Sequence, residues 1–268
     1  MNTDLHMLDI DTNNKQISFI YNRIVRVFSF FKEGASNGTG FFIKENGLLL
    51  TCCHVISGRL LRDLRVSEDF KNTLGNTEGE KIDNYIRSKI QKIEVVLADG
   101  TQEKVILKSF DYVHDIALLK TTKSSGKKPF FEFELENKLD YLDEILFCGF
   151  SEAPYYDNFH SPFAVNTGLV SAFPELIIGG EKYKHVQLNS INLGGNSGAP
   201  LFTKDSNKVC GIINGNYIRH HEKLAVYDDN EKITKGRFEV PLSIAYATEV
   251  RVLKDNSDIF KRLIMCKD

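Results

Sequence analysis

The sequence predicts an all-β protein built in two halves. Most of the chain consists of short apolar or alternating segments separated by turns rich in Gly, Asn and Asp, as strands require. A Ser-, Gly- and Lys-rich stretch, 123–130, separates these segments into two groups and is typical of a linker. With 268 residues, 42% of them hydrophobic, the chain can bury a substantial core as one structural unit.

The first half opens on a segment in which basic and apolar residues alternate, as in a half-buried strand. Two apolar strands follow, joined by a Lys-Glu-Asn-Gly turn, and His54 stands at the exit of the second one. A later hairpin turns at Ala98–Thr101, and Asp115 directly precedes the last strand. The expected strands are 23–28, 38–43, 47–56, 93–97, 102–107 and 116–120.

The second half shows the same texture of short strands and turns. Its expected strands are 144–150, 166–172, 184–188, 201–202, 208–213 and 238–242, and a closing helix is expected within 243–266. Between the two early strands and the hairpin of the first half, the charged segment 58–92 is an insertion with helix-like spacing at Leu60–Leu64. It is either a solvated decoration or a lid or docking element.

A glycine-rich turn, Gly194–Pro200, presents Ser197 just before an apolar strand. Glycines on both sides permit positive φ angles and a close approach of the backbone to a bound atom. The N–H groups of Gly195 and Ser197 are therefore candidates for an oxyanion hole. The alternative is an ordinary Gly-Asn-Ser-Gly β-turn without a chemical role.

A serine hydroxyl attacks a carbonyl only when a base removes its proton and a third group orients that base. His54, at the end of a strand, is the candidate base. Asp115, at the start of another strand, is the candidate orienting acid. The chain thus contains one candidate for each part of a Ser-His-Asp triad.

Three sequence blocks occur in a fixed order along the chain. The first, which carries the candidate base, is Gly38-Thr39-Gly40-Phe41 together with Leu50-Thr51-Cys52-Cys53-His54-Val55. The second is Asp115-Ile116-Ala117-Leu118-Leu119-Lys120, and the third is Gly195-Asn196-Ser197-Gly198. They resemble the catalytic blocks of the trypsin/chymotrypsin-like serine peptidases, closest to the bacterial HtrA/Deg type, over roughly 23–250 with gaps. The resemblance implies a chymotrypsin-like fold of two six-stranded antiparallel β-barrels with the active site between them. The expected layout is an N-terminal arm (1–18), a first barrel (19–122, insertion 58–92), the linker (123–130), a second barrel (131–250) and a C-terminal helix or tail (251–268). The PDZ modules that usually follow the HtrA peptidase domain are not expected.

The resemblance also implies the chemistry. Ser197 attacks the peptide carbonyl, His54 takes and returns the proton, Asp115 orients the imidazole, and the amides of Gly195 and Ser197 hold the oxyanion. No metal ion or organic cofactor is needed. The alternative is a catalytically silent protease fold that serves as a protein-binding or sensing module, with the oxyanion turn in an inactive shape.

By the same resemblance, Ile191 is the floor of the pocket for the side chain that precedes the scissile bond. Asn214 and Asn216, on the substrate-pairing segment, and Asn192 are expected to line it, and Asn216 narrows its mouth. An apolar floor favours small or medium aliphatic residues. A buried Lys or Arg would find no counter-charge there.

Other reactive residues have less specific explanations. Cys52 and Cys53 adjoin the candidate base, but on a strand one of them must point away, and we interpret both as small core residues. His220, His221 and Glu222 suggest metal ligands, but adjacent residues of an extended chain face opposite ways, so a surface loop is the preferred interpretation.

Composition limits the partners and the location. The net charge of −2, with acids and bases mixed, indicates neither nucleic acid nor membrane as a partner. There is no export signal and no apolar run of about 18 residues, and an odd number of cysteines, five, argues against a disulfide framework. We therefore expect a cytoplasmic protein. The resemblance implies that it acts on polypeptides, and without a PDZ module or an export signal it is expected to be targeted or activated by a protein partner. Asn196 carries no charge that a new N-terminus could pair with, so control is expected from the loops 58–92 and 150–166.

Overall fold

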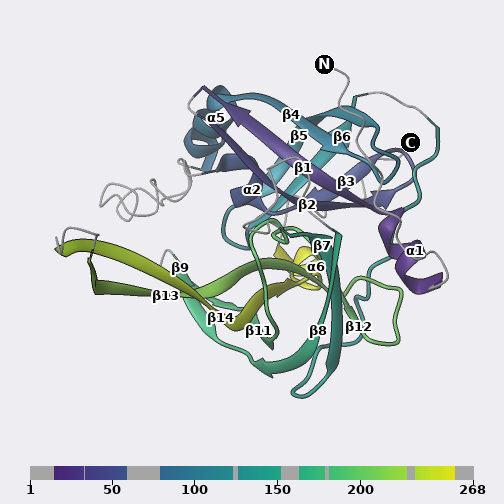
Figure 1. Cartoon of the computed structure of the whole chain (residues 1–268). Helices are drawn as coiled ribbons and strands as arrows, with labels where there is room; N and C mark the ends of the chain where they lie inside the picture. The colour runs from purple at the N-terminus through teal and green to yellow at the C-terminus, as the bar shows by residue number, and fades with distance from the viewer. Residues whose placement is uncertain are drawn as a thin grey trace.

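The structure, a computed structural model, describes residues 15–32, 34–58, 79–122, 126–151, 163–178, 181–227 and 233–256. Two closed antiparallel barrels of six strands each lie one above the other in Figure 1. The predicted all-β double barrel is therefore confirmed.

The first barrel follows the strand order β1-β2-β3-β6-β5-β4. Strands β3 and β6 are mainly apolar runs that are buried on both faces, whereas β5 alternates exposed and buried positions at its start. Its strands are β1 (Ile24–Phe31), β2 (Gly34–Lys44), β3 (Leu48–Thr51), β4 (Ile90–Val96), β5 (Gln102–Asp111) and β6 (Ile116–Thr121).

The second barrel follows the order β11-β14-β13-β12-β7-β8, which is the order of the first barrel once β9 and β10 are left out. Those two strands form a separate hairpin. The strands of this half are β7 (Glu144–Phe150), β8 (Phe163–Ala172), β9 (Glu175–Ile178), β10 (Glu181–Lys184), β11 (Val186–Asn189), β12 (Pro200–Thr203), β13 (Gly211–Tyr227) and β14 (Ile233–Glu249).

The apolar core continues from the first barrel across the junction into the second. The fully buried ring of Phe131, just after the linker, lies edge-on between Phe41 of β2 and Phe202 of β12, with ring centroids 6.0 Å and 5.2 Å away. Burying one such ring stabilises the fold by about 1.5–3 kcal/mol. This contact joins β2 of the first barrel to β12 of the second.

Four helices are described: α1 (Lys15–Tyr21), α2 (Cys53–Ser57), α5 (Gly79–Lys89) and α6 (Val252–Asn256). Helix α1 begins inside the stretch expected to be a polar arm, of which 1–14 lie outside the described residues. Helix α5 forms the end of the charged insertion, whose segment 59–78 also lies outside them. None of the helices in these ranges is long and apolar enough to cross a membrane.

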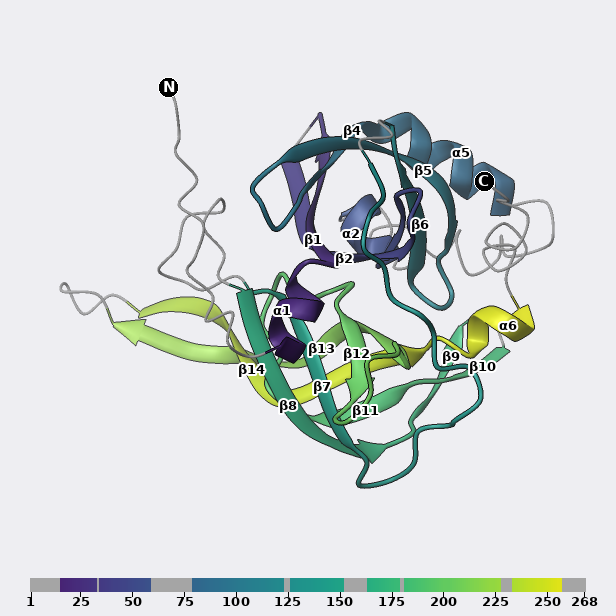
Figure 2. The same cartoon turned by 90° about the vertical axis from the view of Figure 1, so that its right-hand side faces the viewer.

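β13 and β14 pair far beyond the barrel and form a ribbon that projects from it (Figure 2). The surface loop expected at His220–Glu222 is wrong, because these residues belong to β13. His220 pairs with Glu239 and His221 with Phe238 of β14. A projecting two-stranded ribbon needs no apolar face against a core, so a polar run of this kind does not distinguish it from a loop.

Candidate active site

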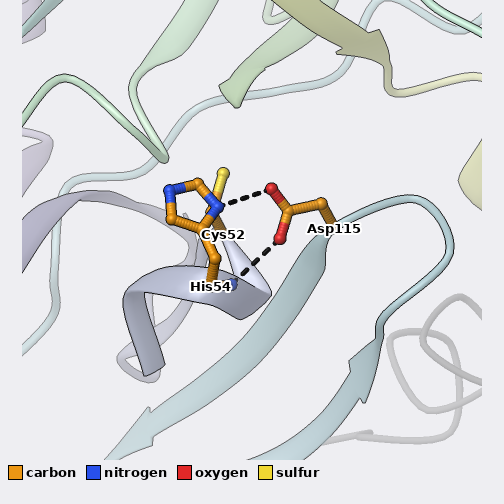
Figure 3. A group of neighbouring side chains, drawn as sticks. All are labelled: Cys52, His54 and Asp115. Carbon is orange, nitrogen blue, oxygen red and sulfur yellow. Dashed lines mark hydrogen bonds and ion pairs between the residues drawn. The ribbon is translucent and has the colours of Figure 1, made fainter. Parts of the chain in front are cut away.

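His54 lies in the first turn of α2, directly after β3, and not at the end of a strand. Its backbone N–H donates to Oδ1 of Asp115 at 2.9 Å, and its ring Nδ1 lies 2.6 Å from Oδ2 of the same carboxylate (Figure 3). The His54 side chain is 37% exposed, whereas that of Asp115 is 12% exposed. A carboxylate at Nδ1 selects the tautomer that leaves Nε2 with its lone pair, as a general base requires.

Asp115 has the left-handed backbone φ of +58°, which costs most L-residues about 1–2 kcal/mol and which Asp tolerates better than most. Three bonds hold it there. Its carbonyl accepts the N–H of Cys53 at 3.2 Å, and its carboxylate accepts the two bonds from His54. The strained residue therefore persists because its surroundings fix it from both ends.

A second Asp-His pair lies immediately before Asp115. Oδ1 of Asp111 accepts the N–H groups of Val113 and His114 at 2.9 Å and 3.0 Å, and its Oδ2 lies 2.6 Å from Nδ1 of His114. Burial alone would raise the pKa of Asp111, but the hydrogen bonds and charge of His114 outweigh it and hold the pKa below its ordinary value. The pair shapes the turn that delivers Asp115.

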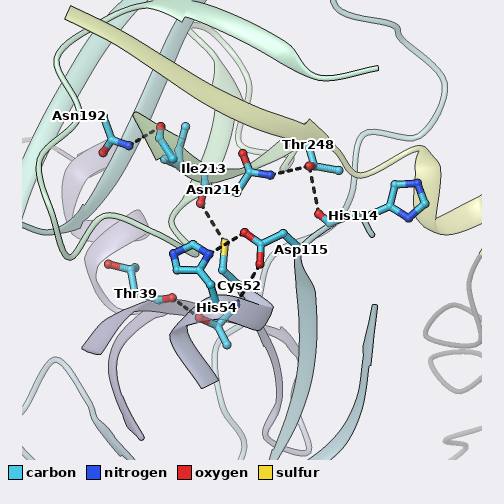
Figure 4. A network of polar contacts seen from close by, with 11 residues as sticks. Thr39, Cys52, His54, His114, Asp115, Asn192, Ile213, Asn214 and Thr248 are labelled. Carbon is cyan, nitrogen blue, oxygen red and sulfur yellow. Dashed lines mark hydrogen bonds and ion pairs between the residues drawn. The ribbon is translucent and has the colours of Figure 1, made fainter. Parts of the chain in front are cut away.

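The second barrel is tied to this turn. The hydroxyl of Thr248 in β14 donates to the His114 carbonyl at 3.1 Å and accepts Nδ2 of Asn214 at 2.8 Å (Figure 4). The ring of Tyr183 in β10 meets that of His114 edge-on, with centroids 5.1 Å apart. Asp115 thus sits on a loop that both barrels hold.

Ser197 lies in a turn that the backbone bonds define closely. The N–H of Asn196 meets the carbonyl of Leu193 at 3.4 Å, and Gly195 has φ of +86°, as at the third position of a type II turn. Gly198 has φ of +89°, and a side chain there would come within 2.0 Å of the Thr39 carbonyl. Both glycines are therefore required by the geometry.

The serine turn lies against the segment that carries the base. A Cβ on Gly198 would come within 2.5 Å of Thr51 Oγ1 and 3.1 Å of the Cys52 nitrogen, at the end of β3. The Ser197 carbonyl accepts the N–H of Thr39 at 2.8 Å. The structure thus brings the turn of the candidate nucleophile beside the segment of the candidate base.

Two backbone donors of this turn, the N–H groups of Gly195 and Ser197, have no acceptor within the described part of the chain. Gly195 is buried and Ser197 is half-buried. Buried backbone N–H groups without partners are rare in folded proteins. These two N–H groups, one on a buried and one on a half-buried residue, are candidate donors to an oxyanion beside Ser197.

Cys52 Sγ, a nitrogen of His54 and a carboxylate oxygen of Asp115 all lie within 4.8 Å of one another, and such donors suit a zinc ion (Figure 3). The separation of Nδ1 and Oδ2, 2.6 Å, is that of a hydrogen bond. Two ligands bound at about 2.0–2.1 Å to one tetrahedral zinc would be roughly 3.3 Å apart. The arrangement therefore fits a hydrogen-bonded acid and base better than a metal site.

The Cys52 thiol is fully buried and lies 3.2 Å from the Ile213 carbonyl. Burial, and then the charge of Asp115, raise its pKa well above the ordinary value. It is therefore a neutral thiol and not a thiolate nucleophile. Cys53 is buried against Ile86 of α5. These contacts favour the interpretation of both cysteines as core residues, although they lie at the start of α2 and not on a strand.

The four residues predicted to line the substrate pocket differ in exposure and in their hydrogen-bond partners. Ile191 is 58% exposed, whereas Asn192 is buried and donates Nδ2 to the Gly215 carbonyl at 2.8 Å. Asn214 turns its amide to Thr248, and Asn216 pairs with Ala245 as part of β13. Asn192 thus bridges the segment before the serine turn and the segment after β12.

Sequence reasoning missed Asp111, treated His114 only as a neighbour of Asp115, and gave no role to Thr39 or Thr248. The Asp-x-x-His spacing is a local signal for the first pair, because an Asp side chain commonly accepts backbone N–H groups two and three residues on. The hydroxyls of Thr39 and Thr248 have no comparable local signal, since each donates to a carbonyl on the opposite side of the barrel junction.

The structure thus has two closed barrels, with a carboxylate-held imidazole and the turn of a candidate serine nucleophile at their junction. A family profile described as "Trypsin-like peptidase domain" matches residues 38–212. Since this match covers more than half of the chain, the protein belongs to the trypsin-like peptidase domain family.

Two curated relatives and one solved structure are also similar to this chain. The "Serine protease HTRA1" of Xenopus laevis is 26% identical over 203 residues, which cover 72% of this chain and 35% of that protein. The "Putative protease Do-like 14" of Arabidopsis thaliana is 27% identical over 187 residues, which cover 67% and 35%. The chain spans about a third of the length of these relatives. The crystal structure of the serine endoprotease from Yersinia pestis has a TM-score of 0.59 at 17% identity, covering 94% of this chain and 66% of that one, and shows the shared fold.

The Asp111–His114 pair makes a pH-dependent contribution to stability. Because the folded pKa of Asp111 is lowered, this contribution is present above the ordinary value of 3.8 and is lost as the pH falls through the folded pKa. We expect Asp111→Asn to lower the free energy of unfolding by about 1–3 kcal/mol at pH 6, and the difference from the wild type to shrink toward pH 3. Urea unfolding across this range measures it. The control is Asp83→Asn, which removes a half-exposed ion pair with Arg87 on α5. A loss no larger than that of the control, or one that does not change with pH, would contradict the role given to Asp111.

Proposed function

We propose that this protein is a serine endopeptidase that cleaves peptide bonds through an acyl-enzyme on Ser197. The observation that carries the proposal is the pair of N–H groups, of Gly195 and Ser197, that have no acceptor among the described residues. The carboxylate-held imidazole of His54, on the segment against which the serine turn packs, supports it. Membership of the trypsin-like peptidase family implies a polypeptide substrate.

The proposed reaction has two halves. Ser197 Oγ attacks the scissile carbonyl while Nε2 of His54 takes its proton, and the negative oxygen is held by the two N–H groups of the turn. His54 then returns the proton to the leaving amine as the C–N bond breaks, which leaves an ester on Ser197. Water, deprotonated by the same imidazole, hydrolyses this ester. In both halves, the Asp115 carboxylate keeps its hydrogen bond to Nδ1 of His54, which orients the ring and stabilises its protonated form.

The shape of the turn favours an active enzyme over a silent binding module. Rotating the Gly194–Gly195 peptide away from the serine would convert the type II turn into type I, with φ near −90° at Gly195. The observed φ is +86°. Only a glycine adopts this angle without strain, so the residue type and the conformation agree.

For specificity, we propose small or medium aliphatic residues before the scissile bond. Asn192 crosses to the Gly215 carbonyl, so a side chain entering between these two segments meets a neutral amide. Ile191 and Leu193, on either side of Asn192, are exposed apolar residues, 58% and 38%. Ile191, Asn192 and Leu193 offer no carboxylate, so a cationic side chain beside them would be desolvated without a counter-charge from these three residues.

We further propose that a protein partner, and not N-terminal cleavage, controls activity. Asn196 is fully buried and neutral, and its Oδ1 accepts the Ser151 hydroxyl at 3.1 Å. It offers no charge to a new N-terminus.

We also propose a cytoplasmic location. The four described cysteines are buried free thiols, which suit a reducing compartment: Cys52, Cys53, Cys148 and Cys210.

A fluorophosphonate probe tests the nucleophile. We expect the purified protein to be phosphonylated at Ser197, and Ser197→Ala and His54→Ala to lose labelling and peptidase activity by several orders of magnitude, because the triad acts as a unit. The matched control is Ser88→Ala, which removes an exposed serine on α5. A wild type that stays unlabelled, alone and with candidate partners, would instead support the silent module.

Cleavage-site profiling on a denatured proteome tests the specificity. We expect Val, Ala, Leu and Ile before the cut, with soft preferences among them, since one methylene changes discrimination by only about 1–3 kcal/mol. Replacing the bridging side chain, in Asn192→Ala, is expected to admit larger apolar residues. Predominant cleavage after Lys or Arg would show that the pocket is assigned wrongly even if Ser197 is the nucleophile.

A further inference from the structure

Thr39, in β2, is fully buried at the junction of the two barrels. Glycines flank it because the facing backbone and side chains leave no room. A Cβ on Gly38 would lie 2.5 Å from the Val55 side chain and 2.8 Å from the Ser197 carbonyl, and one on Gly40 would lie 2.9 Å from the Leu50 carbonyl. The strand therefore presses the backbone of Thr39 against the serine turn.

Every polar group of Thr39 is used. Its hydroxyl donates to the Gly195 carbonyl at 2.8 Å and accepts the N–H of Phe150, the last residue of β7, at 3.0 Å. Its N–H donates to the Ser197 carbonyl at 2.8 Å, and its own carbonyl accepts the Thr51 hydroxyl at 2.6 Å. One residue of the first barrel thus binds the carbonyls of both residues that supply the candidate oxyanion donors (Figure 4 shows Thr39 to the left of His54).

These bonds fix the peptide groups that follow the two donors. The Gly195–Asn196 peptide is held at its oxygen by Thr39 and at its nitrogen by the Leu193 carbonyl. The Ser197–Gly198 peptide is held at its oxygen by the Thr39 N–H and at its nitrogen by the Ile213 carbonyl, 2.7 Å away. Each plane is anchored at both ends, and Thr39 supplies one anchor of each.

We propose that Thr39 is a positioning residue that sets the oxyanion hole, an inference that rests on the proposed peptidase function. Gly195 has more backbone freedom than any other residue type would have at this position, so a bond from outside the turn is needed to fix the direction of its N–H group. The Thr39 hydroxyl supplies that restraint and, through Phe150, ties it to the second barrel. The hydroxyl touches neither the substrate nor the reacting atoms, and it acts only through the turn.

Two substitutions separate the hydroxyl from the shape of the side chain. Thr39→Val keeps the volume and loses both hydroxyl bonds, whereas Thr39→Ser keeps the hydroxyl. Thr39→Ala also loses the hydroxyl but leaves room for water, and it serves if the valine variant fails to fold. The control is Thr121→Val, a buried threonine at the end of β6 in the same barrel.

With an internally quenched peptide that carries Val before the scissile bond, we expect Thr39→Val to lower kcat about 10- to 100-fold with little change in KM. This is less than the 100- to 1,000-fold that loss of one hole donor costs, because the donors are misplaced and not removed. The rate of fluorophosphonate labelling is expected to fall in parallel. Thr39→Ser and Thr121→Val are expected to stay within about threefold of the wild type, and a Thr39→Val variant that does so too would overturn the proposal.

Amide hydrogen exchange reads the same restraint without activity. We expect the amides of Asn196 and Gly198 to exchange at least about tenfold faster in Thr39→Val or Thr39→Ala than in the wild type, and Thr39→Ser to restore their protection. Unchanged protection in both hydroxyl-free variants would overturn the positioning role. If the wild type is neither labelled nor active but these amides respond, the peptidase proposal fails and the role of Thr39 in holding the turn stands.

Discussion

The backbone of β2 lies directly against the backbone of the serine turn, and the rest of the site depends on this contact. The Thr39 carbonyl lies so close to Gly198 that no side chain fits there, and the Thr39 N–H donates a hydrogen bond to the Ser197 carbonyl at 2.8 Å. Backbone hydrogen bonds at this distance define position more narrowly than apolar packing does, because they are directional. They bring a turn of the second barrel beside the segment of the first that carries His54.

A second tie holds the acid end of the site. The Thr248 hydroxyl, from the second barrel, binds the His114 carbonyl, next to the strained Asp115 of the first. The candidate serine turn and the candidate Asp-His pair are therefore both positioned by bonds from the opposite barrel. The chemistry we propose therefore rests on the way two separately closed barrels are joined, and the buried ring of Phe131 adds an apolar contact between them.

Features with a local signal could be predicted from the sequence. The strand at Glu144–Phe150 was expected with the bounds that the structure has, and the turn at Ser197 follows from its glycines. The double barrel was expected only through the family resemblance that the short motifs carry. Thr39 could not be assigned a role, because the partner of its hydroxyl lies 156 residues away. The role we propose for Thr39 can be recognised only from a structure in which the two barrels are placed against each other. Asp111 is different, since its partner His114 is three residues away and the spacing could have been recognised.

We propose that the backbone N–H groups of Gly195 and Ser197 already form an oxyanion hole beside an activated serine. A crystal structure of the protein soaked with a peptide boronic acid tests it most directly. We expect boron bonded to Ser197 Oγ and one boronate oxygen within hydrogen-bond distance, about 2.7–3.1 Å, of both backbone nitrogens. A protein that leaves the boronate unbound, or one in which the Gly195 N–H points away from it with φ near −90°, would contradict the account.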